Sequence, residues 1–176
     1  MKIICFLTAT LFYAGACFGQ NTAANKASVK AAAKQMSIAL VNKDYKNFVK
    51  TTYPSVVAKT EGGIARLAKD LERQIADMAK DGTTILAAWA GEPSAIIDTA
   101  GEYQCTIPQK MTMKLPEGKI TTETTLIASS PDRGRTWYFM DSADRSINTM
   151  RSMFPNISSR LVIPKSPEAV FVQDKK

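Results

Sequence analysis

The sequence predicts an α+β domain, in which a curved antiparallel β-sheet is covered on one face by the helical first half of the chain. Two observations favour this class. Residues 84–141 contain strand-like segments with period-two alternation, separated by turn residues. Residues 27–80 instead carry apolar side chains at helical spacing, in one stripe per segment, as covering one face of a sheet requires.

The first 19 residues are predicted to be a targeting segment rather than part of the fold. Lys2 supplies positive charge, residues 3–14 are apolar, and small residues follow. Cleavage fits after Ala16 or after Gly19, and the second is preferred. An alternative makes Cys17 the lipidated residue of an anchored lipoprotein. The targeting segment therefore predicts an exported protein, periplasmic or secreted. No other segment is long and apolar enough to span a membrane.

Removal of residues 1–19 leaves 157 residues, which suits a single domain over residues 20–164 and a flexible tail over residues 165–176. Cys105 then remains alone and is expected to be a small core residue. Basic residues outnumber acidic ones by 22 to 16, but the two signs are mixed and no aromatic residues interleave with a basic cluster. We therefore expect a basic solvated surface and no nucleic-acid binding. Without histidine or a Cys/His ligand spacing, no metal site or cofactor is predicted.

The first two helices are predicted from spacing and capping. Apolar residues at helical spacing indicate a helix over about Ala27–Asn42, opposite a stripe of lysines. Asp44 is placed to cap a short helix over residues 45–52. Pro54 limits this second helix.

Two further helices follow the same reasoning. Thr60 is expected to cap a long helix over Glu61–Lys80. Gly82 stands where a helix usually ends. A final short helix is expected near Asp144–Met153, before Pro155.

The strands are bounded by turn residues. Residues 84–90 and 94–98 form a strand interrupted at Gly91–Pro93. Over residues 103–115 the odd positions are mostly apolar and the even ones polar, so one face is buried and the other is wet. Pro108 lacks an N–H, which indicates an edge section or a bulge there.

Two turns complete the meander. Gly118 is expected to have a positive φ in a tight hairpin, and residues 120–129 then form a β-branched strand. Residues 131–134 form the second turn. In residues 136–141, Trp137 and Phe139 are expected to point inward and Tyr138 and Met140 outward.

This order of elements resembles the α+β cone of the nuclear-transport-factor-2-like superfamily, which includes polyketide-cyclase-like and ketosteroid-isomerase-like enzymes. It is most similar to secreted bacterial members. The likeness covers nearly the whole mature chain, and the segments that carry it are Asn42–Pro54, Gly91–Ser94, Cys105–Lys119, Arg135–Asp141 and Met153–Asn156. The resemblance implies a sheet wrapped around three N-terminal helices, with a conical cavity between them. No catalytic motif of the superfamily matches this sequence, so no catalytic residue is carried over.

Three functions follow as hypotheses. The first is a non-enzymatic domain that binds a small ligand or a protein partner. The second is an isomerase-like or cyclase-like enzyme, in which Asp98, Asp141 or a tyrosine would supply acid–base chemistry. For either, the candidate pocket residues are aromatic: Tyr45, Tyr53, Trp89, Tyr103 and Trp137. The same residues can equally fill the interior as ordinary core.

The third hypothesis is an assembly protein. Four apolar side chains are expected on the outer face of the sheet, where an exposed patch often marks an interface. They predict a homodimer through Leu86, Ile127, Tyr138 and Met140.

Overall fold

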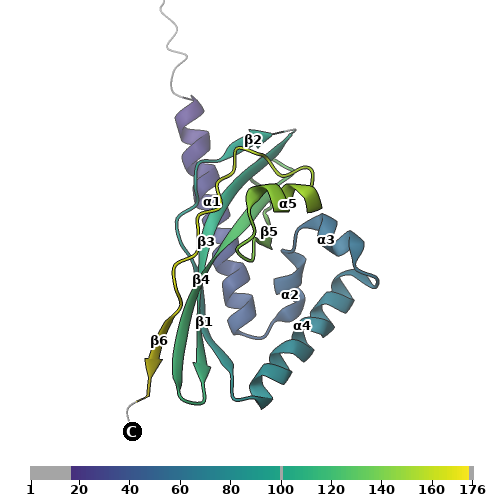
Figure 1. Ribbon diagram of the computed structural model, residues 1–176. Helices are drawn as coiled ribbons and strands as arrows, with labels where there is room; N and C mark the ends of the chain where they lie inside the picture. The colour runs from purple at the N-terminus through teal and green to yellow at the C-terminus, as the bar shows by residue number, and fades with distance from the viewer. Residues whose placement is uncertain (1–16, 100, 175–176) are drawn as a thin grey trace, which may run out of the picture.

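The structure, a computed structural model, describes residues 17–99 and 101–174, so residues 1–16 of the expected targeting segment lie outside the described residues. The fold is α+β (Figure 1). In chain order the elements are α1 (Cys17–Val41), α2 (Tyr45–Lys50), α3 (Pro54–Lys59), α4 (Gly63–Lys80), β1 (Thr84–Ala90), β2 (Ile97–Thr99), β3 (Glu102–Leu115), β4 (Gly118–Ser130), β5 (Tyr138–Asp141), α5 (Ile147–Met153) and β6 (Val170–Gln173).

The six strands form one antiparallel sheet. An antiparallel sheet was predicted for residues 84–141, but its sixth strand was not. Its order is β1-β3-β4-β5, with β2 on the β1 side of β3 and β6 on the β5 side of β4. The long hairpin of β3 and β4 is the centre of the sheet, and a two-residue turn joins its strands between Leu115 and Gly118. Within the described residues no pairing joins β1 to β5, so the sheet is not closed.

Helix α1 packs on one face of the sheet, here called the α1 face. Its buried residues Val29, Ala33 and Met36 contact a cluster from the central strands and the last hairpin. The members of that cluster on the sheet side are Cys105, Ile107, Leu126, Ala128, Trp137 and Phe139. The odd positions of β3 therefore point inward here, as the alternation predicted.

The opposite face, here called the α5 face, is also covered where β4 meets β5. Ile127 and Met140 pack against Met150 of α5 and against the segment that follows this helix. That segment contributes Phe154, Ile157 and Leu161. The sheet is thus buried on both faces at this end, whereas the sequence predicted one buried face only.

The short helices differ from the expectation at Pro54. Asp44 caps α2 as predicted, since its Oδ1 accepts a hydrogen bond from the Asn47 N–H at 3.2 Å. Helix α2 already ends at Lys50, before Pro54. Pro54 instead occupies the first position of an additional helix, α3. Proline is well suited to that position because its missing N–H would have no partner there.

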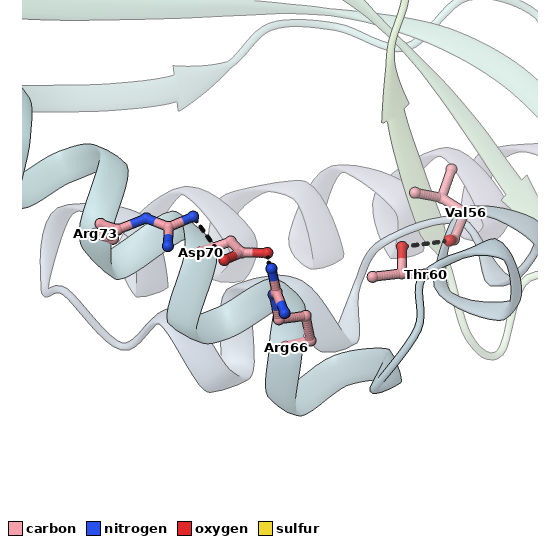
Figure 2. Close-up of polar contacts among 5 residues, drawn as sticks. All are labelled: Val56, Thr60, Arg66, Asp70 and Arg73. Carbon is pink, nitrogen blue, oxygen red and sulfur yellow. Dashed lines mark hydrogen bonds and ion pairs between the residues drawn. The ribbon is translucent and has the colours of Figure 1, made fainter.

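Thr60 ends α3 instead of capping the helix that follows. Its Oγ1 donates to the Val56 carbonyl at 2.9 Å (Figure 2). Gly62 (φ 82°) and Gly63 (φ 55°) then turn the chain through left-handed conformations into α4. At the other end, Gly82 (φ 78°) follows the last turn of α4, as predicted.

Gly118 was expected to have a positive φ, and this is wrong. It lies in β4 without one, and β6 pairs with it. A Cβ at this position would clash with the Val172 carbonyl oxygen. The requirement for glycine here is close approach of a neighbouring strand rather than turn geometry.

Strand β6 lies within the segment expected to be a flexible tail. It pairs with Gly118–Thr121 of β4, and its four side chains are exposed. Asp174 extends the contact, because its N–H donates to the Glu117 carbonyl at 3.0 Å and its carboxylate pairs with Lys114. The sequence did not predict this strand. Backbone pairing holds it in place, and its side chains are exposed, so it has no alternation of buried and exposed residues.

No helix among residues 17–99 and 101–174 is both long and apolar enough to cross a bilayer. The expectation of no spanning segment therefore holds for this part of the chain.

Candidate functional site

A mostly apolar cavity of about 430 Å³ lies between the α1 face of the sheet and helices α1 to α4. Its volume falls in the range of roughly 300–1,000 Å³ that is typical of small-molecule sites. The sheet side of its wall comes from β1, β3, β4 and β5: Ile85, Gln109, Met111, Leu126, Phe139, Met140 and Asp141. The helices and the segment between α2 and α3 supply the rest: Met36, Leu40, Phe48, Thr51, Thr52, Val56, Leu71, Ile75 and Met78.

The cavity exists because α4 does not pack closely on the sheet. Its apolar stripe includes Leu71, Ile75 and Met78, yet no side chain of α4 is fully buried. The helix contacts α2 and α3 more than it contacts β1, and it stands apart from the central strands (Figure 1). The space that its stripe faces is the cavity.

The opposite side of α4 is charged. Asp70 accepts hydrogen bonds from Arg66 at 2.7 Å and from Arg73 at 3.0 Å (Figure 2). Exposed pairs of this kind add little stability. The helix is therefore amphipathic, with a solvated face and a face that borders the cavity.

Four methionines line the cavity: Met36, Met78, Met111 and Met140. Unbranched thioether side chains adapt to ligands of different shape, which is why they are common at adaptable apolar sites. The wall can therefore adjust to what it encloses.

Gln109 is a buried polar residue of this wall. Its side chain is 8% exposed and lines the cavity, and its Nε2 has no hydrogen-bond partner among the described residues. An unpaired buried amide costs about 1–3 kcal/mol. Gln109 Nε2 is thus an unpaired donor that is enclosed by protein atoms and is not open to the cavity.

Two other polar side chains of the wall, Thr51 and Asp141, are hydrogen-bonded within the protein. Thr51 donates through Oγ1 to the Phe48 carbonyl at 2.7 Å. Asp141 is exposed at the end of β5, and its Oδ1 accepts from the Ala143 N–H at 2.8 Å. Asp141 lines the cavity, whereas Asp98, the other carboxylate considered for acid–base chemistry, lies in β2 away from it.

The five aromatic residues predicted for the pocket are not brought together, and none of them lines this cavity. Trp137 is 3% exposed in the core under α1, where its Nε1 donates to Ser28 Oγ at 2.9 Å. Tyr103 is half-buried against the same core. Tyr45 borders a broader groove of about 820 Å³ between α2 and α4, together with charged residues.

Trp89 lies outside because of a β-bulge. The pairing of β1 with β3 shifts between Ile85 and Ala87, so Leu86 is an extra residue. Beyond the shift Trp89 is opposite Lys110, on the face away from the cavity, and it is 44% exposed. A one-residue shift exchanges the two faces of a strand, which the sequence alternation alone could not show.

Tyr53 borders a separate pocket of about 290 Å³ with Glu102, Ser129 and Tyr138. Burial, followed by the charge of Glu102, raises the pKa of Tyr53 above its ordinary value. The Glu102 carboxylate accepts hydrogen bonds from Ser129 at 2.7 Å and from Gln104 at 3.2 Å. One oxygen of this carboxylate is therefore part of a network that ties β3 to β4.

The residues proposed for a dimer do not form one exposed patch. Ile127 is 1% exposed and Met140 is 8% exposed, because α5 and the segment after it cover them. Tyr138 is half-buried and Leu86 is 43% exposed at the bulge. The sequence did not reveal that the C-terminal part of the chain returns over this face.

Cys105 is fully buried in the core under α1, and burial raises the pKa of its thiol to about 12. It is therefore a packing residue, as expected, since a thiol at such a pKa is not a nucleophile at neutral pH. No group of three or more His, Cys, Asp or Glu side chains in the described part of the chain is arranged to hold a metal ion.

The fold and the cavity together define an α+β domain with an apolar hollow of ligand size. Comparison with known protein families, curated proteins and solved structures finds no match to this chain.

Proposed function

We propose that this chain is an exported, non-enzymatic domain that binds a small, mostly apolar ligand in the cavity between α4 and the sheet. The observation that carries the proposal is the half-buried apolar stripe of α4, which faces an open volume instead of the core. Leaving Leu71, Ile75 and Met78 partly uncovered forgoes apolar burial, which a ligand in the cavity would restore.

The chemistry of the wall supports binding rather than turnover. Asp141 is its single ionisable side chain among the described lining residues, and it is exposed. General acid–base catalysis usually needs a positioned group whose environment tunes it, and commonly a partner for it. Export is supported by the N-terminal pattern of Lys2 and residues 3–14.

Membership of the nuclear-transport-factor-2-like superfamily is part of this proposal. Members of this superfamily have three helices before the sheet. In this chain α1, α2 and α4 correspond to those three helices, and α3 is additional. A cavity between those helices and the sheet is what a cone of this type would enclose.

The enzymatic alternative has one observation in its favour, the pocket that holds Tyr53, Glu102 and Tyr138. A carboxylate beside tyrosines is suited to proton transfer on a small molecule. Against it, Glu102 is already hydrogen-bonded to Ser129 and Gln104, which is typical of a structural role.

The proposal is tested by filling the cavity. We expect the purified protein to bind N-phenylnaphthylamine, a neutral apolar fluorophore, with a rise in fluorescence. Ile75→Trp places an indole in the cavity and should weaken binding by about tenfold or more. Gln74→Trp, on the exposed side of the same helix, is the control and should bind as the natural protein does.

Circular dichroism establishes that both variants are folded before they are compared. Equal binding by Ile75→Trp and Gln74→Trp would contradict the proposal, because the probe would then be elsewhere.

A further inference from the structure

We propose that a second pocket, separate from the apolar cavity, binds a small primary ammonium compound through the carboxylate of Glu102. This pocket has a volume of about 290 Å³, and Tyr53, Glu102, Ser129, Tyr138 and Asn156 are among the residues that line it. Its volume lies at the lower end of the range of roughly 300–1,000 Å³ that is typical of small-molecule sites. It shares no lining residue with the apolar cavity, so the two sites are independent.

Strand pairing places the polar wall of this pocket on the α5 face. Gln104, Ser129 and Tyr138 are cross-strand partners in β3, β4 and β5. Directly opposite residues of antiparallel strands lie on the same face, and so do residues two apart in one strand. Glu102 therefore lies on the face of Gln104, which is hydrogen-bonded to the segment after α5.

The Glu102 carboxylate is held in place through one of its two oxygens. Its Oε2 accepts hydrogen bonds from Ser129 Oγ at 2.7 Å and from Gln104 Nε2 at 3.2 Å. Its Oε1 accepts none from the described residues and is not one of their fully buried unpaired atoms, so it keeps accessible surface. The carboxylate thus has a fixed orientation and one oxygen left for a ligand.

Two tyrosines stand beside this carboxylate. The hydroxyl of Tyr138 forms no hydrogen bond with the described residues, and it too keeps accessible surface. Helices α3 and α5 lie next to each other (Figure 1), and at their ends the rings of Tyr53 and Phe154 meet edge to face, 5.8 Å apart. Burial and then the charge of Glu102 raise the pKa of Tyr53, so its hydroxyl lies close enough to feel the carboxylate.

The charge of the pocket favours a cation. Glu102 takes part in none of the ion pairs of the described chain, although basic residues outnumber acidic ones by 23 to 16 in the sequence. No described lysine or arginine lines the pocket. A half-buried carboxylate with a free oxygen forms its strongest hydrogen bond with a charged donor, and an ammonium group supplies one.

The nearest pocket contains a lysine that already has other partners. Lys59 lines a neighbouring pocket of about 180 Å³. Its Nζ donates to the Met153 carbonyl at 3.3 Å and lies 5.0 Å from the centre of the Phe154 ring. These contacts hold its charge in the neighbouring pocket, so Glu102 is left without a counter-ion.

The test is a titration of the natural protein with three compounds of similar size and different charge: benzylammonium, benzyl alcohol and benzoate. Amide chemical shifts in NMR spectra report the binding. Benzylammonium should give saturable shifts at Ser129, Tyr138 and Asn156. Benzyl alcohol should bind about tenfold more weakly, and benzoate should give no shifts there.

Glu102→Gln removes the charge and keeps an oxygen that can accept from Ser129. This variant should lose the preference for benzylammonium and keep its affinity for benzyl alcohol. Glu117→Gln is the control, because it removes the same charge at an exposed position of the β3–β4 turn and should keep the preference.

Tyr138→Phe is a second variant that does not depend on the carboxylate. It should weaken benzylammonium binding by about threefold to tenfold. The ligand-free variant should melt at the temperature of the natural protein, since the hydroxyl has no partner among the described residues. Tyr45→Phe, the same exchange in the groove between α2 and α4, should bind as the natural protein does.

Four results would overturn the inference. They are the absence of saturable shifts, equal affinity for benzylammonium and benzyl alcohol, an unchanged preference in Glu102→Gln, and loss of the preference in Glu117→Gln as well. If Glu102→Gln does not fold, Tyr138→Phe decides, and unchanged affinity in that variant overturns the inference. Binding of N-phenylnaphthylamine reports on the other cavity, so either proposal can fail without the other.

Discussion

Gln104 and Gln109 lie on the same strand, but their side-chain amides differ in hydrogen bonding. On the α5 face, Gln104 Nε2 donates to the Asn156 carbonyl at 2.9 Å and its Oε1 accepts from the Ser158 N–H at 2.9 Å. This glutamine fastens the segment after α5 to the sheet. Gln109 Nε2, on the other face, has no such partner in the described chain.

The signal for Gln109 was present in the sequence. It occupies an odd, inward position of β3, between Ile107 and Met111, in a row that is otherwise apolar. A polar residue in a buried row is more informative than another apolar one. The aromatic residues, by contrast, were chosen by type, and side-chain type does not determine which face a residue occupies.

Trp137 is hydrogen-bonded to helix α1 within the core. Its indole N–H donates to Ser28 Oγ at 2.9 Å, and this hydroxyl donates to the Gly134 carbonyl at 2.5 Å. The pair joins α1 to the turn before β5. Asp132 fixes the same turn, where hydrogen bonds led by the Thr136 N–H lower its pKa to about 2.

We expect Ser28→Ala to lower the free energy of unfolding by about 1–3 kcal/mol, because it leaves the indole N–H and a carbonyl without partners. Ser152→Ala, at an exposed site on α5, is the control and should change it by less than about 0.5 kcal/mol. Urea denaturation of both variants measures the difference. Equal effects would show that the Ser28 hydroxyl does not hold α1 to this turn.

At the scale of elements, the sequence predicted what depends on local patterns. The α4 stripe, the β3–β4 hairpin and the cap at Asp44 follow from spacing and turn chemistry, and all are confirmed. The bulge at Leu86 and the strand β6 depend on pairing between distant segments. Such pairing leaves no periodic trace, so these elements were missed.

Strand β6 offers a test at this scale. Gly118→Ala should displace β6, since the added methyl group would meet the Val172 carbonyl oxygen, while β3 and β4 stay paired. Hydrogen exchange should then show faster exchange at the Asp174 amide and in Val170–Gln173 only. Lys119→Ala, the exposed neighbour on β4, should leave β6 protected. Unchanged protection in Gly118→Ala would show that β6 does not lie this close to β4.

At the scale of the whole molecule, the two ends of the sheet differ. Where β4 meets β5, α1 covers one face and α5 with its following segment covers the other. Towards α4, the α1 face borders the cavity instead. The first end gives the fold its core, and the second leaves room for a ligand.

Residues 62–63 and Gly82 bound α4 at both ends with left-handed conformations. The helix is thus joined to the remainder of the molecule through short glycine-containing turns and touches β1 only lightly. The placement of α4 is therefore what determines whether the cavity exists.

A crystal structure of the purified protein under xenon pressure tests most directly whether an apolar cavity lies between α4 and the sheet. Xenon enters apolar cavities and is located by its electron density. We predict xenon among Met36, Leu71 and Met111, with α4 held away from β3. Contact of Leu71 and Ile75 with Met111, and no xenon between them, would contradict the account.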